Sequence, residues 1–237
     1  MKSLLIPSLI IWLSACADTA IKNYALPEQL AQPTDTSTLA CRYTKQTSDA
    51  KNQSATNWYF WRQPQRTETR DELSNQGEVW ERNQTEQLFY TRLFYNEKVA
   101  LEFVPGDLAA TGVEPAWEQL TTLVNRRSLG KELALLNKTT SAGLDIEFYR
   151  GTINNVDTEI DWIPALQLPA RIAKRFPDAA VTLTLSDCGQ AAKFSVKPIS
   201  KSELDNMRRI DFTDLGDMED DLMVRHIEQL MSRHQHP

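Results

Sequence analysis

The stretch GLDIEFYRGTINNVDTEIDW, residues 143–162, decides the fold class. In its first half every second residue is apolar, namely Leu144, Ile146 and Phe148. In its second half apolar residues alternate with aspartate and glutamate up to Trp162. Successive side chains of a β-strand point to opposite faces, so this period of two predicts strands with one buried and one solvated face. Such strands are typical of an antiparallel sheet.

The same pattern extends outward from this stretch in both directions. Pro105-Gly106 is a turn signal. It lies between the strands expected up to residue 104 and the segment of helical periodicity that begins at about residue 115. The further strands are expected within residues 38–45, 57–63, 66–72, 77–83, 86–95, 98–104, 131–139 and 180–188. The body of the chain is therefore predicted to be one antiparallel sheet.

Two segments have helical spacing instead. Pro115 at the start and Gly130 beyond the end predict a helix over about 115–128. Near the C-terminus, MEDDLMVRHIEQLMSRH (218–234) places apolar residues on one stripe of an amphipathic helix, with Asp217 as the expected N-cap. The predicted fold class is α+β: an antiparallel sheet with a mid-chain helix and a C-terminal amphipathic helix.

The N-terminus has the organisation of a secretory signal. Lys2 supplies a positive charge, Leu4–Leu13 is apolar apart from Pro7 and Ser8, and small residues precede Cys16. The apolar run is too short to span a bilayer, which takes about 20 residues. A buried core helix is the alternative interpretation.

The sequence Leu13-Ser14-Ala15-Cys16 resembles the lipobox of bacterial lipoprotein precursors. This resemblance implies cleavage before Cys16 and attachment of acyl chains to that residue, which together give a stable membrane anchor. Ala17, where an aspartate would favour retention in the inner membrane, implies a lipid anchor in the outer membrane facing the periplasm. The inner membrane is the alternative.

The charge of the chain excludes some classes of partner. Without Lys2, 25 of the 26 basic residues remain against 32 acidic residues, which makes the net charge −7. An acidic chain without a basic stripe argues against a nucleic-acid partner. It also argues against electrostatic attachment to anionic lipid surfaces. With 41% hydrophobic residues, the chain is still expected to bury a sizeable core.

Two cysteines remain if Cys16 carries lipid. In an oxidising periplasm, Cys41 and Cys188 are most simply joined as a disulfide. Two buried free thiols are the alternative.

The sequence offers little catalytic chemistry. It has no phosphate loop, nucleotide-binding fingerprint or HExxH motif, only eight glycines, and no histidine before residue 226. The acidic residues between Asp211 and Asp221 do not match the spacing of a calcium loop. We therefore expect no catalytic residues, metal or cofactor, and hence no enzyme. An anchored hydrolase that uses His226 is the alternative.

Aromatic residues are dense in the consecutive strands between residues 58 and 103. Alternation divides them between the two faces of the sheet. They belong either to a closely packed core or to a concave sheet with an apolar cavity.

Several short motifs resemble the LolA/LolB/RseB family of half-barrels. They are WRQPQRTETRDE (61–72), the G-x-x-W hairpin at Gly77–Trp80, the mid-chain helix and IDWIPALQLPARI (160–172). The resemblance implies a curled antiparallel β-sheet, a half-barrel, that is lidded by helices and whose concave side binds acyl chains or senses lipoproteins. The candidate lining residues by position are Trp58, Phe60, Phe89, Phe103, Ile146, Phe148 and Trp162.

These observations predict four parts of the chain. They are a signal peptide (1–15), a lipidated tether (16–37), a LolA/LolB-like half-barrel (38–198) and an acidic segment with the terminal helix (199–237). The expected function is that of a lipid-anchored envelope protein that binds an acyl or lipid ligand, in lipid or lipoprotein handling. The alternative is a non-enzymatic scaffold that docks another envelope protein.

Overall fold

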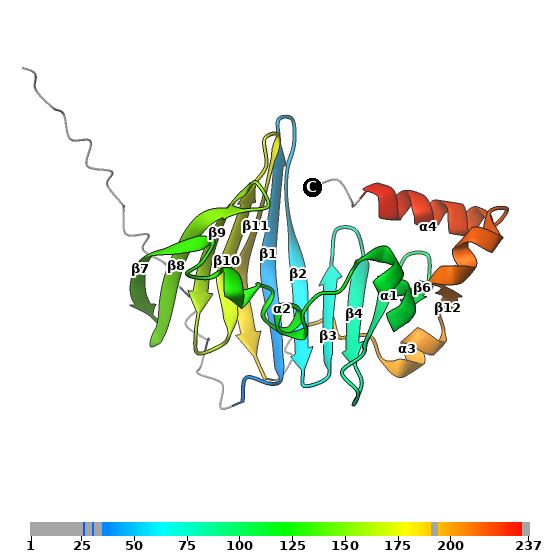
Figure 1. Cartoon of the computed structure of the whole chain (residues 1–237), viewed down its shortest axis with the longest axis horizontal. Coiled ribbons are helices and arrows are strands. Elements are labelled where there is room, and N and C mark those ends of the chain that lie inside the picture. The colour runs from blue at the N-terminus through cyan, green and yellow to red at the C-terminus, as the bar shows by residue number, and fades with distance from the viewer. Residues whose placement is uncertain (1–25, 27–29, 31–34, 191–193, 234–237) are drawn as a thin grey trace, which may run out of the picture.

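The computed structural model describes residues 26, 30, 35–190 and 194–233 (Figure 1). The predicted signal peptide, Cys16 and most of the tether lie outside these residues. Among the described residues, no helix combines the length and the apolar character that crossing a bilayer requires.

A single sheet dominates the structure. Its first six strands form a meander: β1 (Leu39–Asp49), β2 (Gln53–Gln63), β3 (Arg66–Asp71), β4 (Gln76–Arg82), β5 (Leu88–Phe94) and β6 (Val99–Phe103). The second meander consists of β7 (Leu133–Ser141), β8 (Leu144–Ile153), β9 (Val156–Ile163), β10 (Leu168–Arg175) and β11 (Ala179–Gly189). β12 (Arg208–Asp211) completes the sheet.

The two meanders join in the middle of the sheet. The strand order is β12-β6-β5-β4-β3-β2-β1-β11-β10-β9-β8-β7, so β11 returns to pair with β1. All the pairs are antiparallel except β12 with β6. The prediction of an antiparallel sheet is confirmed for both meanders, and β12 adds one parallel strand.

Helices contribute less than the α+β prediction implies. Between β6 and β7 lie α1 (Pro105–Thr111), α2 (Trp117–Thr122) and the short 3-10 helix η1 (Arg126–Ser128). After β11 come α3 (Lys201–Asp205), the 3-10 helix η2 (Phe212–Met218) and α4 (Leu222–Arg233).

The predicted helix over 115–128 is shorter than expected. It ends at Thr122 because Leu123 adopts a left-handed conformation, with φ of 62°, and turns its side chain toward the sheet. The predicted N-cap of the terminal helix was also wrong. The carboxylate of Asp221, not Asp217, accepts hydrogen bonds from the amides of Met223 and Val224.

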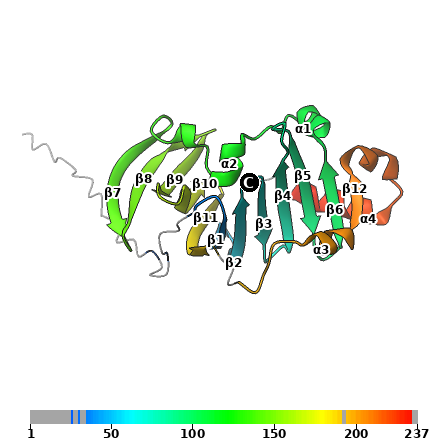
Figure 2. The same cartoon turned by 90° about the horizontal axis from the view of Figure 1, so that it is seen from below.

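The sheet curls, and its two faces are covered differently (Figure 2). On the concave face, α2 lies over the central strands and α1 lies near β5 and β6. α4 and η2 pack against the apolar residues of β5, β6 and β12. On the convex face, the chain from Phe194 to Met207 crosses the first meander and packs on Tyr59 and Trp61 and then on Val79 and Leu93.

The buried core follows from the alternation. Tyr43 on β1, Phe60 on β2 and Leu185 on β11 share one fully or nearly fully buried cluster with Cys41 and Cys188. A second cluster joins Ile160, Trp162 and Ile172 to Val124, which follows α2. The concave face is thus closely packed around β9–β11, and a cavity opens at the centre of the first meander.

Candidate functional site

A cavity of about 380 Å³ lies between the concave face and α2. Trp58 on β2 and Trp80 on β4 supply its aromatic surface, and Leu120 and Leu123 form its apolar roof. Trp80 is held in place by stacking on Tyr90, with the ring centroids 4.4 Å apart. The other lining residues are Lys45, Thr67, Thr69, Asp71, Ser74, Gln76, Gly77, Glu78, Arg92 and Gln119.

The position of the tryptophans follows from strand register. Trp58 pairs with Asp71 across β2 and β3, and Thr67 pairs with Trp80 across β3 and β4. Residues directly opposite one another, or two apart on the same strand, share a face. Both indoles therefore face the concave side, with the threonines of β3 between them.

One side of the cavity is polar and its charges balance. The ammonium of Lys45 lies 2.6 Å from the carboxylate of Asp71. The guanidinium of Arg92 donates to the side-chain oxygen of Gln76 at 3.2 Å. Burial and the nearby charge of Glu78 raise the pKa of the Tyr90 phenol well above its usual range, so that group stays neutral. The cavity therefore offers apolar rings and leucines beside two cations and two carboxylates.

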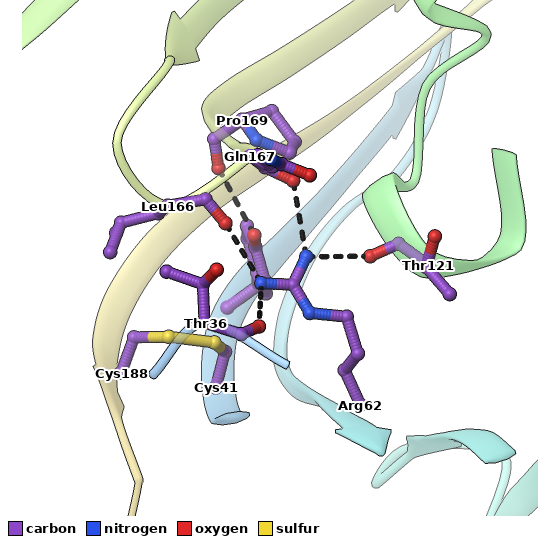
Figure 3. Close-up of a disulfide and its surroundings, with 9 residues drawn as sticks. Thr36, Cys41, Arg62, Thr121, Leu166, Gln167, Pro169 and Cys188 are labelled. Atoms are coloured by element: carbon purple, nitrogen blue, oxygen red, sulfur yellow. Dashed lines mark hydrogen bonds between the residues drawn. A yellow bond between two sulfur atoms is a disulfide. The ribbon is translucent and has the colours of Figure 1, made fainter. Parts of the chain in front are cut away.

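Arg62 ties the surroundings of the cavity together (Figure 3). Its side chain is 5% exposed, and its guanidinium donates to four backbone carbonyls instead of to a carboxylate. These carbonyls belong to Thr36 (2.5 Å), Leu166 (2.8 Å), Thr121 (2.9 Å) and Gln167 (3.3 Å). Burial lowers the pKa of Arg62 below its ordinary value.

These four hydrogen bonds connect three separate segments. Thr121 lies on α2, Leu166 and Gln167 form the turn between β9 and β10, and Thr36 is where the described chain enters the sheet. α2 is also held near its start, where the Arg82 guanidinium lies 4.9 Å from the Trp117 ring centroid. The helix over the cavity is therefore attached to the sheet at both ends.

The predicted disulfide is confirmed. Cys41 and Cys188 are bonded across the neighbouring strands β1 and β11, at a sequence separation of 147 residues. The bond joins the first meander to the second close to the carbonyls that Arg62 binds (Figure 3). Tyr43 adds a second connection there by donating to the carbonyl of Pro169 at 3.0 Å.

The predicted lining residues do not all meet in this cavity. Trp58 lines it. Phe60 lies directly beside it on the same face, stacked on Trp58 at 6.4 Å, but is fully buried in the core. Trp162 is also a core residue, packed with Val124 beneath the segment after α2.

The remaining four candidates lie elsewhere. Phe103 stacks on Phe212 at 4.5 Å, beneath η2. Phe89 pairs with Glu81, which places it on the convex face, where it is 37% exposed. Ile146 and Phe148 lie on the face of β8 that carries Asp161 of β9, where Ile146 is fully buried in the same core cluster as Phe60 and Phe148 packs against that cluster. None of these four residues lines the cavity beneath α2.

Several residues of the cavity were not predicted as site residues. Trp80 was recognisable as a strand aromatic, and Leu120 and Leu123 as the apolar stripe of a helix, but neither pattern shows what the residue faces. Arg62 gave no signal beyond a cation at the end of an aromatic run. In the described part of the chain, no three histidine, cysteine, aspartate or glutamate side chains are grouped to hold a metal ion.

Comparison with known proteins gives distant likenesses. No family model and no curated protein matches the sequence. Among solved structures, PNGF-II is 12% identical, with a TM-score of 0.42 over 76% of this chain and 33% of that one. MucB is 11% identical, with a TM-score of 0.39 over 71% of this chain and 56% of that one.

A LolA superfamily protein, NE2245 from Nitrosomonas europaea, is also among the matches. It is 8% identical, with a TM-score of 0.26 over 72% of this chain and 90% of that one. The chain spans about a third of the length of PNGF-II. A LolA superfamily structure is thus among those that the chain resembles, but likenesses at these TM-scores and identities assign the chain to no family.

Proposed function

We propose that this chain is a lipid-anchored envelope protein that binds an amphiphilic ligand in the cavity beneath α2, in lipid or lipoprotein handling. The observation that supports this proposal is the cavity itself, with two tryptophans below and two leucines above. Its volume of about 380 Å³ is in the usual range for small-molecule sites, roughly 300–1,000 Å³.

The lining narrows the ligand beyond the acyl chain expected from sequence. An acyl chain can pack against Trp58, Leu120 and Leu123. It offers no polar group to the ion pair of Lys45 and Asp71 or to the Arg92 guanidinium. A ligand with both a hydrocarbon part and a polar group matches both sides. We therefore propose an amphiphile whose apolar part lies under α2 and whose polar group lies toward Lys45 and Arg92.

The proposed anchor is tested separately from the cavity. Replacing Cys16 by alanine is expected to abolish incorporation of radiolabelled palmitate, because the lipobox places the acyl chains on that residue. Palmitate that still enters the Cys16→Ala protein would contradict the proposed anchor and leave the cavity proposal intact.

The ligand proposal is tested with protein extracted from membranes. Native mass spectrometry is expected to show a retained amphiphile, and a fluorescent amphiphile is expected to bind once that ligand is removed. Trp58→Ala should weaken binding of the probe, whereas Phe89→Ala should leave it unchanged because Phe89 lies on the convex face. Equal binding by both variants, or no binding by the wild type, would contradict the proposal.

A second function is favoured by the edge of the sheet. β7 is an edge strand whose Leu135 and Leu136 are 43% and 57% exposed. An edge strand can pair with an extended segment of another protein. We propose as the second function that this edge docks an extended segment of another envelope protein. Leu136→Asp should then remove capture of that partner without changing binding of the fluorescent probe.

A further inference from the structure

Four charged side chains line the cavity beneath α2. Lys45 and Arg92 are the cations, and Asp71 and Glu78 are the carboxylates, so the lining as a whole carries no net charge. These four groups differ in whether another side chain of the protein already neutralises their charge. The charges that are not neutralised in this way are the ones that a ligand can recognise.

Lys45 and Asp71 neutralise each other. The Lys45 ammonium lies 2.6 Å from one carboxylate oxygen of Asp71. The other carboxylate oxygen accepts from the backbone amides of Leu73 and Ser74, at 2.9 and 3.1 Å, in the turn that follows β3. Both oxygens of Asp71 are therefore engaged within the protein, and the charge of Lys45 is balanced.

Glu78 and Arg92 are arranged differently. They lie directly opposite each other on the neighbouring strands β4 and β5. Residues two apart on a strand share a face, so Glu78 lies on the same face of β4 as Trp80, toward the cavity. Among the residues that the structure describes, neither Glu78 nor Arg92 forms an ion pair, although both line the same space.

Both groups keep hydrogen-bonding capacity for a ligand. The Arg92 guanidinium donates to the side-chain oxygen of Gln76 at 3.2 Å, and a guanidinium has five N–H donors in a rigid fork. The Glu78 carboxylate lies beside the Tyr90 hydroxyl, and its two oxygens offer about four lone-pair sites. The floor of the cavity therefore presents one cation next to one carboxylate.

We infer that the head group of the ligand is zwitterionic, with its anionic group on Arg92 and its ammonium on Glu78; this inference rests on the proposed function. A purely anionic head group is attracted by Arg92 but repelled by Glu78, and a purely cationic head group meets the reverse conflict. A zwitterion matches both charges.

Phosphoethanolamine and phosphocholine head groups have this chemistry. Their ammonium is two carbons from the phosphate, which suits two side chains on opposite residues of neighbouring strands, whose Cβ atoms lie about 4.5–5.5 Å apart. A guanidinium also binds a phosphate in a bidentate manner.

The experiment uses the full chain in dodecyl maltoside, a detergent whose uncharged head group makes it the neutral reference. A bound fluorescent amphiphile is displaced by three probes that have the same dodecyl chain. They are zwitterionic dodecylphosphocholine, anionic dodecyl phosphate and cationic dodecyltrimethylammonium. The variants are Glu78→Gln and Arg92→Gln, and the control is Glu81→Gln, which removes a carboxylate from the same strand on the convex face.

The phosphocholine should displace the reporter from the wild type and from Glu81→Gln at about fivefold lower concentration than either singly charged probe, as expected for one partly exposed ion pair. Glu78→Gln should bind dodecyl phosphate as well as the phosphocholine, and Arg92→Gln should bind the trimethylammonium probe as well as the phosphocholine. Glu78 is exposed, so Glu78→Gln should keep the wild-type unfolding temperature even if Arg92→Gln does not fold.

Two results would overturn the zwitterionic head group and still leave an amphiphile in the cavity. One is equal displacement of the reporter by all three charged probes in the wild type. The other is an order of probes that is the same in Glu78→Gln as in the wild type. Failure of the reporter to bind the wild type would instead contradict the proposed function, and this inference with it.

Discussion

Replacing Arg62 by methionine tests how the helix over the cavity is held. Methionine keeps the apolar stem of the side chain and removes the guanidinium, so four backbone carbonyls lose their donor. An intramolecular hydrogen bond contributes about 1 kcal/mol net, which gives about 4 kcal/mol for the four. Removing the guanidinium also relieves the cost of burying a charge, which offsets part of this loss. We expect a net destabilisation of about 3 kcal/mol.

Thermal unfolding followed by circular dichroism measures this change. In a chain of this size 1 kcal/mol corresponds to about 2–4 °C, so the Tm should fall by roughly 6–12 °C. Hydrogen exchange should also accelerate in residues 117–123, because the Thr121 carbonyl is one of the four acceptors.

The matched control is Arg126→Met. Arg126 pairs with Glu118 at 3.1 Å, and both side chains are nearly half exposed. Exposed ion pairs contribute about 0–1 kcal/mol, so its Tm should change little. If Arg62→Met unfolds within about 1 °C of this control, Arg62 does not hold α2 in the way described.

Three further outcomes are expected. Burial raises the pKa of Glu68, so the free energy of unfolding should fall as the pH rises from about 4.5 through that raised pKa. Glu68→Gln should flatten this part of the pH profile of the Tm. A profile identical to that of the wild type would contradict the assignment. Reduction of the Cys41–Cys188 bond should lower the unfolding free energy by about 5 kcal/mol in the chain-entropy model. Denaturant titration with and without reductant measures this difference, and no change would indicate that the bond is absent in solution. Gly151→Ala should lower the free energy of unfolding by about 1–3 kcal/mol, because a Cβ at residue 151 meets the Glu132 carbonyl oxygen. Gly189→Ala is the control, because a Cβ there meets nothing within 4 Å. Equal midpoints of denaturant unfolding for the two variants would refute the close approach.

The strands could be predicted from sequence because a half-buried strand must repeat with a period of two. The helices were harder to predict from the sequence because the positions of their ends depend on single residues. Pro105-Gly106 was interpreted as a turn, yet Pro105 begins α1, where the carboxylate of Asp107 accepts from the Val104 amide. Leu123 ends α2 through a left-handed backbone conformation that no local residue pattern indicates.

The site could be predicted only in part because register decides which alternating residues share a face. A one-residue shift moves every later side chain of a strand to the other face. The β9–β10 pairing shifts between Pro169 and Arg171, and the β1–β11 pairing shifts between Arg42 and Tyr43. Alternation within β8 indicated that Phe148 faces the core, but not that it faces away from Trp162.

Contact quenching of tryptophan fluorescence by a brominated amphiphile tests the ligand cavity most directly. A bromine atom quenches only the indoles that it touches, and Trp58 and Trp80 line the cavity, whereas Trp61 is buried on the convex face with Phe194. We predict that the amphiphile quenches the wild type at concentrations where bromide ion does not. The double substitution Trp58→Phe with Trp80→Phe should lose most of this quenching, and Trp61→Phe should retain it. No quenching of the wild type, or quenching that disappears in Trp61→Phe, would contradict a ligand beneath α2.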